Sequence, residues 1–215
     1  MPRLRVRFCR AEAVQFISHL DLIRVWQRAL RRAAIPLAYS EGFNPHPRMS
    51  LAAPLAVGVT SEAELMDIFT QRDISPHNFA AALGAQLPRG LAISGVIAVP
   101  PLLPSLQSLV EAADYQVTVG TEATDEEIKG RMTRLLALAA LPWQHERDTG
   151  LRQYDLRALV DDLWFEAREG GCVRLGMRLF CDNRGSGRPE QVTLALGLAD
   201  YPARIHRTRL ILKSE

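Results

Sequence analysis

Apolar and polar side chains alternate along the first residues of the chain. Positions 3 to 8 place every second residue on the same side of an extended backbone, which is the period of a β-strand. The pattern predicts a strand that turns Leu4, Val6 and Phe8 towards a core. The opposite side then carries three basic side chains, Arg3, Arg5 and Arg7.

The apolar positions next follow the period of a helix. Ser18 is suited to cap a first turn, and Asp21, three residues later, completes a capping-box pattern. We therefore expect a helix from His19 to about Ala34 that ends before Pro36. Its apolar face holds Leu22, Val25, Trp26, Ala29, Leu30 and Ala33. Its opposite face holds Arg24, Arg28, Arg31 and Arg32.

The remaining patterns suggest two similar halves. The first half continues with predicted strands at 36–40 and 64–70, a helix at 76–87 and a strand at 91–99. After a proline-rich stretch, a strand at 115–119, a helix at 125–140, strands at 151–167 and 172–180, a short helix and a strand at 205–212 follow. This order predicts an α+β protein of two tandem ferredoxin-like (βαββαβ) units with mainly antiparallel sheets, in residues 1–102 and 103–215.

In such units both helices cover one sheet face and leave the other free. Arginines alternate with apolar residues in three predicted strands, so we expect a free face rich in arginine. The positions are Arg3, Arg5, Arg7, Arg174, Arg178, Arg207 and Arg209. RNA-recognition modules bind single-stranded RNA on this face through aromatic side chains, which are missing here, so contacts with the phosphate backbone would dominate.

Charge is unevenly distributed along the chain. Residues 1–50 contain nine arginines and three acids, a net charge of +6, whereas the whole chain carries +2 and the remaining 165 residues therefore carry −4. Arginine matches phosphate geometry well, so a basic N-terminal surface for an anionic partner is one interpretation. An ordinary solvated surface is the alternative.

The loop AYSEGFNPHPRMS, residues 38–50, combines stiffness with chemically varied side chains. Pro45 and Pro47 restrict the backbone, and Gly42 can adopt a positive φ. We interpret the loop as a recognition surface that adjoins His19 and the basic helix. The residues expected to bind RNA or a protein partner are Arg24, Arg28, Arg31, Arg32, Tyr39, Ser40, Gly42, Phe43, Asn44, His46 and Arg48.

Two other interpretations of this region stay open. Phe43 and Met49 could anchor a purely structural loop. In a catalytic alternative, His19 or His46, with Tyr39, would act as general acid or base on an RNA 2′-hydroxyl. The sequence supplies no matched second catalytic group, and His19 also fits a core histidine, so we expect a non-enzymatic protein.

Several classes of site are not indicated by the sequence. Cys9, Cys172 and Cys181 lack the spacing of zinc or iron–sulfur ligands, and no glycine-rich phosphate loop is present, so we expect no metal and no cofactor. No apolar run is long enough to span a membrane, and the N-terminal alternation is unlike a signal peptide. We expect a cytoplasmic protein without membrane contact.

One stretch resembles a known family. Residues 16–67, FISHLDLIRVWQRALRRAAIPLAYSEGFNPHPRMSLAAPLAVGVTSEAELMD, resemble the radical SAM-linked (radical SAM-associated) domain of unknown function, DUF2344, with Ile35 in place of the usual leucine. The second half resembles it through YDLR at 154–157 and RPE at 188–190. The matching positions, none with an assigned role, include His19, Asp21, Tyr39, Ser40, Gly42, Phe43, Asn44, Pro45, Pro47 and Ser50.

The resemblance implies a partner. Proteins of this family are encoded beside, or fused to, a radical SAM protein with a cobalamin-binding-type domain. This chain lacks the cysteine triad of an iron–sulfur cluster, so it would be the accessory protein and not the radical enzyme. The element order is also similar to that of repeat-associated RNA-processing proteins, a fold-level likeness that favours RNA binding.

These observations lead to one expected function and two alternatives. We expect an accessory protein that works with a radical SAM enzyme and binds RNA through its arginine-rich N-terminal half. The first alternative is a protein-interaction subunit that docks on that enzyme without nucleic acid. The second is a metal-independent RNA endonuclease of the repeat-associated RNA-processing type.

Overall fold

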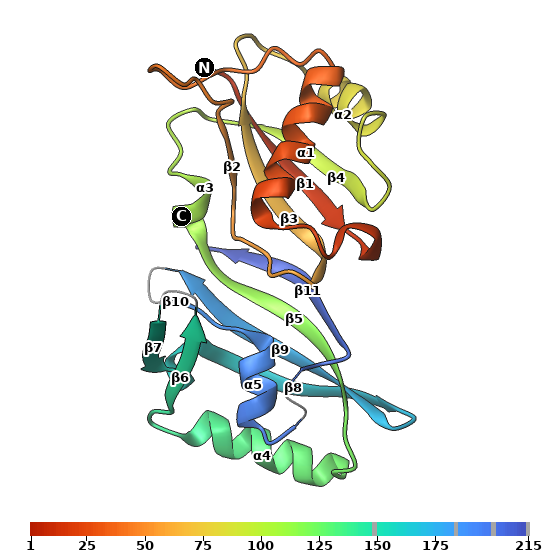
Figure 1. The fold of residues 1–215 in the computed structure, drawn as a ribbon, viewed down its shortest axis with the longest axis vertical. Coiled ribbons are helices and arrows are strands. Elements are labelled where there is room, and N and C mark those ends of the chain that lie inside the picture. The colour runs from red at the N-terminus through yellow and green to blue at the C-terminus, as the bar shows by residue number, and fades with distance from the viewer. Residues whose placement is uncertain (148–149, 183–184, 199–200, 214–215) are drawn as a thin grey trace. The chain divides into compact units, whose positions relative to one another are not determined.

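The computed structural model describes residues 1–147, 150–182, 185–198 and 201–213. The chain forms two compact units (Figure 1). The first comprises Met1–Val110 together with Leu212–Glu215, and the second comprises Glu111–Ile211. The predicted boundary between residues 102 and 103 lies inside the first unit.

The first unit contains a sheet with the strand order β4-β1-β3-β2, in which all neighbours are antiparallel. Register places Arg5 of β1 opposite Asp67 of β3, and Ser50 of β2 opposite the same residue. The elements are β1 (Arg3–Arg10), a 3₁₀ turn (Glu12–Val14), α1 (His19–Arg32), β2 (Met49–Leu51), β3 (Thr60–Phe69), α2 (Pro76–Gly84), β4 (Leu91–Val99) and α3 (Leu106–Leu109).

Both long helices of this unit pack against one face of the sheet and share a core with it. Figure 1 shows the two helices beside the strands. Trp26 of α1 is fully buried and meets the ring of Phe8 edge-on, with the ring centroids 4.8 Å apart. The core further contains Leu4, Val6, Leu22, Ala29, Leu30, Met66, Ile68, Phe79 and Leu83. The predicted apolar faces of the first strand and first helix are therefore those that pack.

The predicted strand at 36–40 is wrong. This segment makes only isolated bridges, between Leu37 and Thr70 and between Tyr39 and Pro47. The strand that forms in this region instead is β2, Met49–Leu51, which pairs with β3. Proline lacks an N–H donor, so the chain around Pro36 cannot form a regular ladder. The pairing begins only after Pro47.

The second unit places β9 beside β5 and β8, both antiparallel, and β5 beside β11. Its strand order is β8-β9-β5-β11, with the short β10 also on β9. The elements are β5 (Val110–Gly120), α4 (Asp125–Ala137), β6 (Pro142–Arg147), β7 (Gly150–Asp155), a 3₁₀ turn (Arg157–Leu159), β8 (Val160–Glu169), β9 (Cys172–Asp182), β10 (Gly185–Ser186), α5 (Pro189–Ala195) and β11 (Arg204–Leu212).

The single strand predicted at 151–167 is divided in the structure. Residues Gly150–Asp155 pair with Pro142–Arg147 as a separate hairpin, and β8 starts only at Val160. The side chain of Asp155 accepts hydrogen bonds from the backbone N–H groups of Leu141 and Arg157, at 2.7 and 2.9 Å. An aspartate that bonds the backbone two residues on favours a turn, and this one ends the strand.

The protein is thus a mixed α/β protein with mainly antiparallel strand pairing. The tandem ferredoxin-like arrangement itself stays a prediction. Within the described part of the chain, none of the helices is long and apolar enough to cross a membrane.

Candidate nucleic-acid interface

Helix α1 carries a stripe of arginines on its solvent side. Arg24, Arg28, Arg31 and Arg32 are all exposed, and the helix contains one acidic residue, Asp21. Asp21 pairs with Arg24 at 2.9 Å, and Arg32 donates to the backbone oxygen of Gln86 at 2.6 Å. Arg28 and Arg31 make no hydrogen bond or ion pair with any residue that the structure describes. We call these four residues the arginine stripe.

The start of α1 is held by Ser18 and Asp21. The Ser18 hydroxyl accepts from the Asp21 N–H at 3.1 Å and donates to the Asp21 carboxylate at 2.8 Å. The hydrogen bond from Ser18, and next that from Arg24, lowers the pKa of Asp21 below its ordinary value. The carboxylate therefore stays charged at neutral pH and keeps Arg24 partly neutralised.

The segment after α1 forms a closed hairpin loop, residues 38–48, which we call the presented loop. Ser40 and His46 close it twice: the Ser40 N–H donates to the His46 carbonyl at 2.9 Å, and the His46 N–H donates to the Ser40 hydroxyl at 3.0 Å. The Arg48 N–H donates to the Ala38 carbonyl at 2.8 Å, and the Ala38 N–H donates to Phe69 of β3 at 2.9 Å. The loop is thereby fixed to the end of the sheet.

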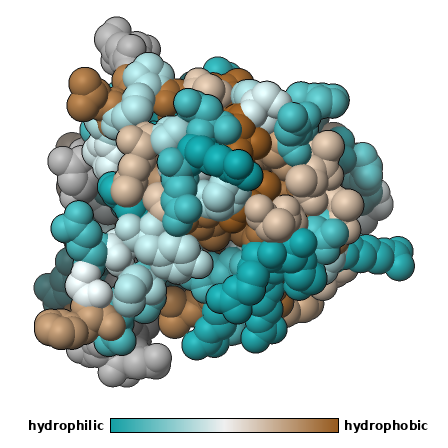
Figure 2. Space-filling model, turned by 90° about the horizontal axis from the view of Figure 1, so that it is seen from above, coloured by the Kyte–Doolittle hydropathy of each residue, from teal (hydrophilic) through white to brown (hydrophobic). Residues whose placement is uncertain are grey.

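The presented loop exposes aromatic side chains. Phe43 at its tip is fully exposed, and Tyr39 at its base is 43% exposed. Gly42 has a φ of 116°, a conformation that side chains with a Cβ rarely adopt, so a glycine is needed just before the tip. Arg48 lies over the ring of Phe69, 4.7 Å from its centroid, and packs on the sheet end while remaining exposed. Figure 2 views the surface from above Figure 1, where hydrophobic side chains lie between hydrophilic ones.

The expectation that the presented loop adjoins His19 is wrong. His19 is the first residue of α1 and the loop follows its last turn, so the helix separates them by about 20 Å at 1.5 Å per residue. The structure therefore does not bring His19 and His46 together as an acid–base pair. His46 and Tyr39 do share the loop, and the side chains of both are exposed.

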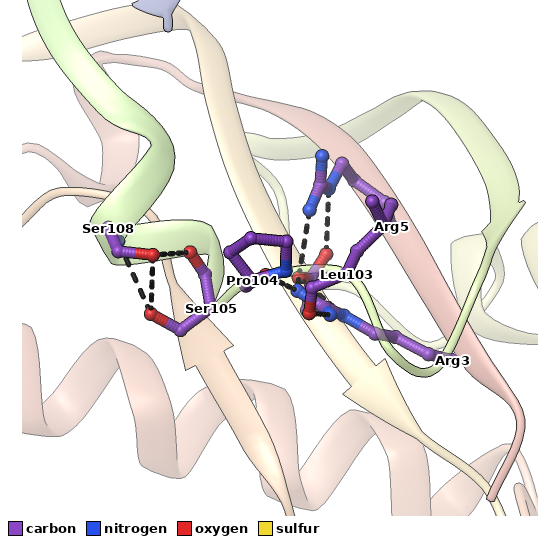
Figure 3. Close-up of polar contacts among 7 residues, drawn as sticks. Arg3, Arg5, Leu103, Pro104, Ser105 and Ser108 are labelled. Atoms are coloured by element: carbon purple, nitrogen blue, oxygen red, sulfur yellow. Dashed lines mark hydrogen bonds and ion pairs between the residues drawn. The ribbon is translucent and has the colours of Figure 1, made fainter. Parts of the chain in front are cut away.

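The predicted free basic face of the first sheet is also wrong. Arg3 is buried and donates to the carboxylate of the buried Asp67. Arg5 donates to the same carboxylate at 2.9 Å (Figure 3). Arg3 also donates to the carbonyls of Leu103 and Pro104, at 2.7 and 2.9 Å. These two guanidinium groups are hydrogen-bonded within the protein. Of the three arginines of β1 in the predicted face, Arg7 is the exposed one. The sequence feature that could have predicted this pairing is Asp67. It lies between the apolar Met66 and Ile68 and so points to the same sheet face as Arg3 and Arg5.

The arginines of the second unit are similarly engaged. Arg178 pairs with Asp114 at 2.7 Å, and this hydrogen bond is the main cause of its raised pKa. Arg174 lies 3.3 Å from Glu166 and 3.4 Å from Glu169, and Arg207 is buried. Of the predicted positions here, Arg209 is exposed. Arginine on a strand was a weak signal because the carboxylate partners come from neighbouring strands.

The family motifs of the second half meet at one place. Tyr154 of β7 donates to the side-chain oxygen of the buried Gln191, and His145 Nε2 lies 3.3 Å from Arg188 Nη1. Sequence reasoning had missed Gln191 and His145 as partners here. These contacts attach the β6–β7 hairpin to α5.

Two observations concern potential metal ligands and thiols among the described residues. No group of three or more His, Cys, Asp or Glu side chains among them is arranged to hold a metal ion. Burial, and next the nearby Glu62 and Glu64 carboxylates, raises the pKa of Cys9, so its thiol stays protonated at neutral pH.

The geometry defines a mixed α/β protein with a basic helix and an aromatic loop on one unit. The chain belongs to the DUF2344 family, described as an uncharacterized protein conserved in bacteria, whose model matches residues 3–189. No curated protein sequence matches the chain.

Two solved structures share the fold. A chain of a Cbf5-Nop10-Gar1 complex matches with a TM-score of 0.55 at 10% identity. The match covers 96% of this chain and 48% of the chain in the complex. A chain of an H/ACA RNP bound to a substrate RNA containing 2′-deoxyuridine has a TM-score of 0.51 at 12% identity, with 96% and 47% coverage. This chain thus spans about half the length of each. At such identities the likeness shows the fold alone.

Proposed function

We propose that this protein is a cytoplasmic, non-enzymatic accessory protein that binds RNA through its first unit. The observation that carries the proposal is the arginine stripe on α1, in which Arg28 and Arg31 make no hydrogen bond or ion pair with any described residue. Unpaired guanidinium groups on a rigid helix fit phosphate groups, which neutralise them and release counterions. The presented loop follows the last turn of the same helix.

The fold is compatible with this role. We propose that the strand orders β4-β1-β3-β2 and β8-β9-β5-β11, each with two main helices, represent two tandem ferredoxin-like units. One of the structural neighbours comes from an RNP bound to a substrate RNA. Because Arg3 and Arg5 are bound to Asp67, the proposal assigns RNA to the helix and loop and not to the open sheet face.

Charge reversal on the stripe tests the proposal. We expect wild-type protein to bind a pool of cellular RNA, measured by fluorescence anisotropy, with an affinity that falls as salt rises. Arg28→Glu/Arg31→Glu should weaken binding about tenfold or more at low salt and reduce the magnitude of the log–log salt slope by about 1 to 1.5. The reason is the loss of about two phosphate contacts.

The matched control is Arg89→Glu/Arg204→Glu, which changes the charge by the same amount at exposed arginines outside the stripe and loop. It should retain most of the affinity. Equal losses in both variants would indicate a non-specific effect of net charge. Absence of binding by folded wild-type protein at low salt would refute the proposal.

A second candidate is docking on a radical SAM protein with a cobalamin-binding-type domain, the partner that the sequence resemblance implies. Its specific support is a group of exposed apolar side chains at the start of α1: Phe16 is 74%, Leu20 67% and Val57 50% exposed. The Gly58 N–H donates to the Gln15 carbonyl at 2.8 Å, which brings Val57 near Phe16.

Phe16→Ser/Leu20→Ser should abolish co-purification of the two proteins after nuclease treatment, whereas a complex unaffected by these changes would exclude this surface.

A further inference from the structure

The tip of the presented loop displays one aromatic ring on a stiff support. Phe43 is fully exposed, while Ser40 and His46 on either side of the tip are joined by two hydrogen bonds of 2.9 and 3.0 Å. Pro45 and Pro47 restrict the descending arm. The ring is therefore held out into solvent and does not fold back on the protein.

Stiffness matters because binding then costs little conformational entropy. The base of the loop is anchored to Phe69 by backbone hydrogen bonds from both arms, with Ala38 donating at 2.9 Å and the Phe69 N–H donating to Arg48 at 3.0 Å. An exposed phenylalanine on a mobile loop would lose this advantage. Here most of the ordering is already provided by the fold.

The surroundings of the ring favour a nucleobase over a protein side chain. Between Ser40 and His46, Phe43 is the one large apolar residue, so the tip offers no apolar surface of the size that a protein interface core requires. The loop follows Arg31 and Arg32, and it contains one acid, Glu41. The loop itself also carries the exposed Arg48, and a ring and a guanidinium group on one segment match a base and its phosphate.

We infer that Phe43 stacks on an unpaired base of single-stranded RNA while the arginine stripe contacts the phosphates. Within an A-form duplex the face of each base is covered by the next base pair. Loops and single strands contain unstacked bases whose faces are open to an aromatic side chain. Stacking tolerates every base, so this contact selects strandedness more than sequence. The inference rests on the proposed RNA-binding function and names its ligand class.

A fluorescent base can test the contact directly. The probe is a single-stranded RNA 12-mer with 2-aminopurine at its centre, compared with the same strand annealed to its complement. We expect wild-type protein to bind the single strand more tightly and to quench 2-aminopurine. Phe43→Ala should lower affinity for the single strand about tenfold and abolish the quenching, with little change for the duplex; Phe43→Trp should retain both.

Controls separate this inference from the proposed function. Leu102→Ala removes another fully exposed apolar side chain outside the loop and should change nothing. If Phe43→Ala bound and quenched like wild type while Arg28→Glu/Arg31→Glu lost affinity, the stacking inference would fail and RNA binding would stand. If wild-type protein bound neither RNA, both would fail, and loss of radical SAM enzyme binding in Phe43→Ala would then assign the tip to a protein partner.

Discussion

At the scale of single residues, the most consequential side chain is a buried carboxylate with two arginine partners. Asp67 is 1% exposed, and Arg3 and Arg5 share it from β1. Burying charge is costly unless it is paired and hydrogen-bonded, and here Arg3 gains two more acceptors from residues 103 and 104. The cluster fixes the proline-rich segment against the sheet and removes these arginines from the surface.

Asp67→Asn tests this account. The change preserves the size of the side chain but leaves a buried guanidinium without its counter-charge, so we expect the free energy of unfolding to fall by about 3 to 5 kcal/mol. Urea denaturation followed by circular dichroism measures it. Asp73→Asn, an exposed aspartate in the same unit, should leave stability nearly unchanged; a similarly small effect of Asp67→Asn would mean that the arginines are solvated.

At the scale of elements, local signals identified the starts of the three long helices, α1, α2 and α4. Ser18 caps α1 as predicted, Ser75 caps α2, and Pro76 opens it at the first position. These features depend on residues within one turn, so the sequence contains them. Strand β2 depends on its pairing with the later strand β3, which no single turn contains. The β6–β7 hairpin is local, but its separation from β8 depends on the bond between Asp155 and the backbone of Leu141, fourteen residues earlier.

The first turn of α4 provides a prediction at this scale. Glu127 accepts from the N–H and hydroxyl of Thr124, at 2.7 and 3.2 Å, and these bonds, the backbone one first, lower its pKa from the ordinary 4.5. A lowered pKa stabilises the fold fully above pH 4.5, and this contribution is lost as the pH falls through the lower folded value. Wild type should therefore exceed Glu127→Gln in thermal stability at pH 6, and the difference should vanish towards pH 2.

Glu126→Gln is the control for this prediction, because it removes the same charge from the same turn without breaking the bonds to Thr124. It should show a smaller stability difference from wild type at pH 6. A difference between wild type and Glu127→Gln that persisted unchanged at pH 2 would contradict the assigned role of the carboxylate.

At the scale of the whole molecule, composition predicted more about class than about the site. The uneven charge pointed to the first unit, and the exposed arginines of α1 agree with that expectation. The arginines of the strands did not, because a strand residue's surroundings are set by the strand beside it: Asp67 and Asp114 come from neighbouring strands. The separation of His19 from the loop also required the folded helix, since residue spacing alone gives no direction in space.

The first unit is built from two segments of the chain that are distant in sequence, and this has a consequence for how the protein is made. Lys213 donates its backbone N–H to the Leu109 carbonyl at 2.7 Å, so the first unit includes residues from beyond the second. A ribosome that synthesises roughly 5 to 20 residues per second needs about 5 to 20 s for residues 111–211. The unit whose synthesis begins first is therefore completed last, because its nascent form lacks the bond between Lys213 and Leu109 until residues 111–213 have emerged.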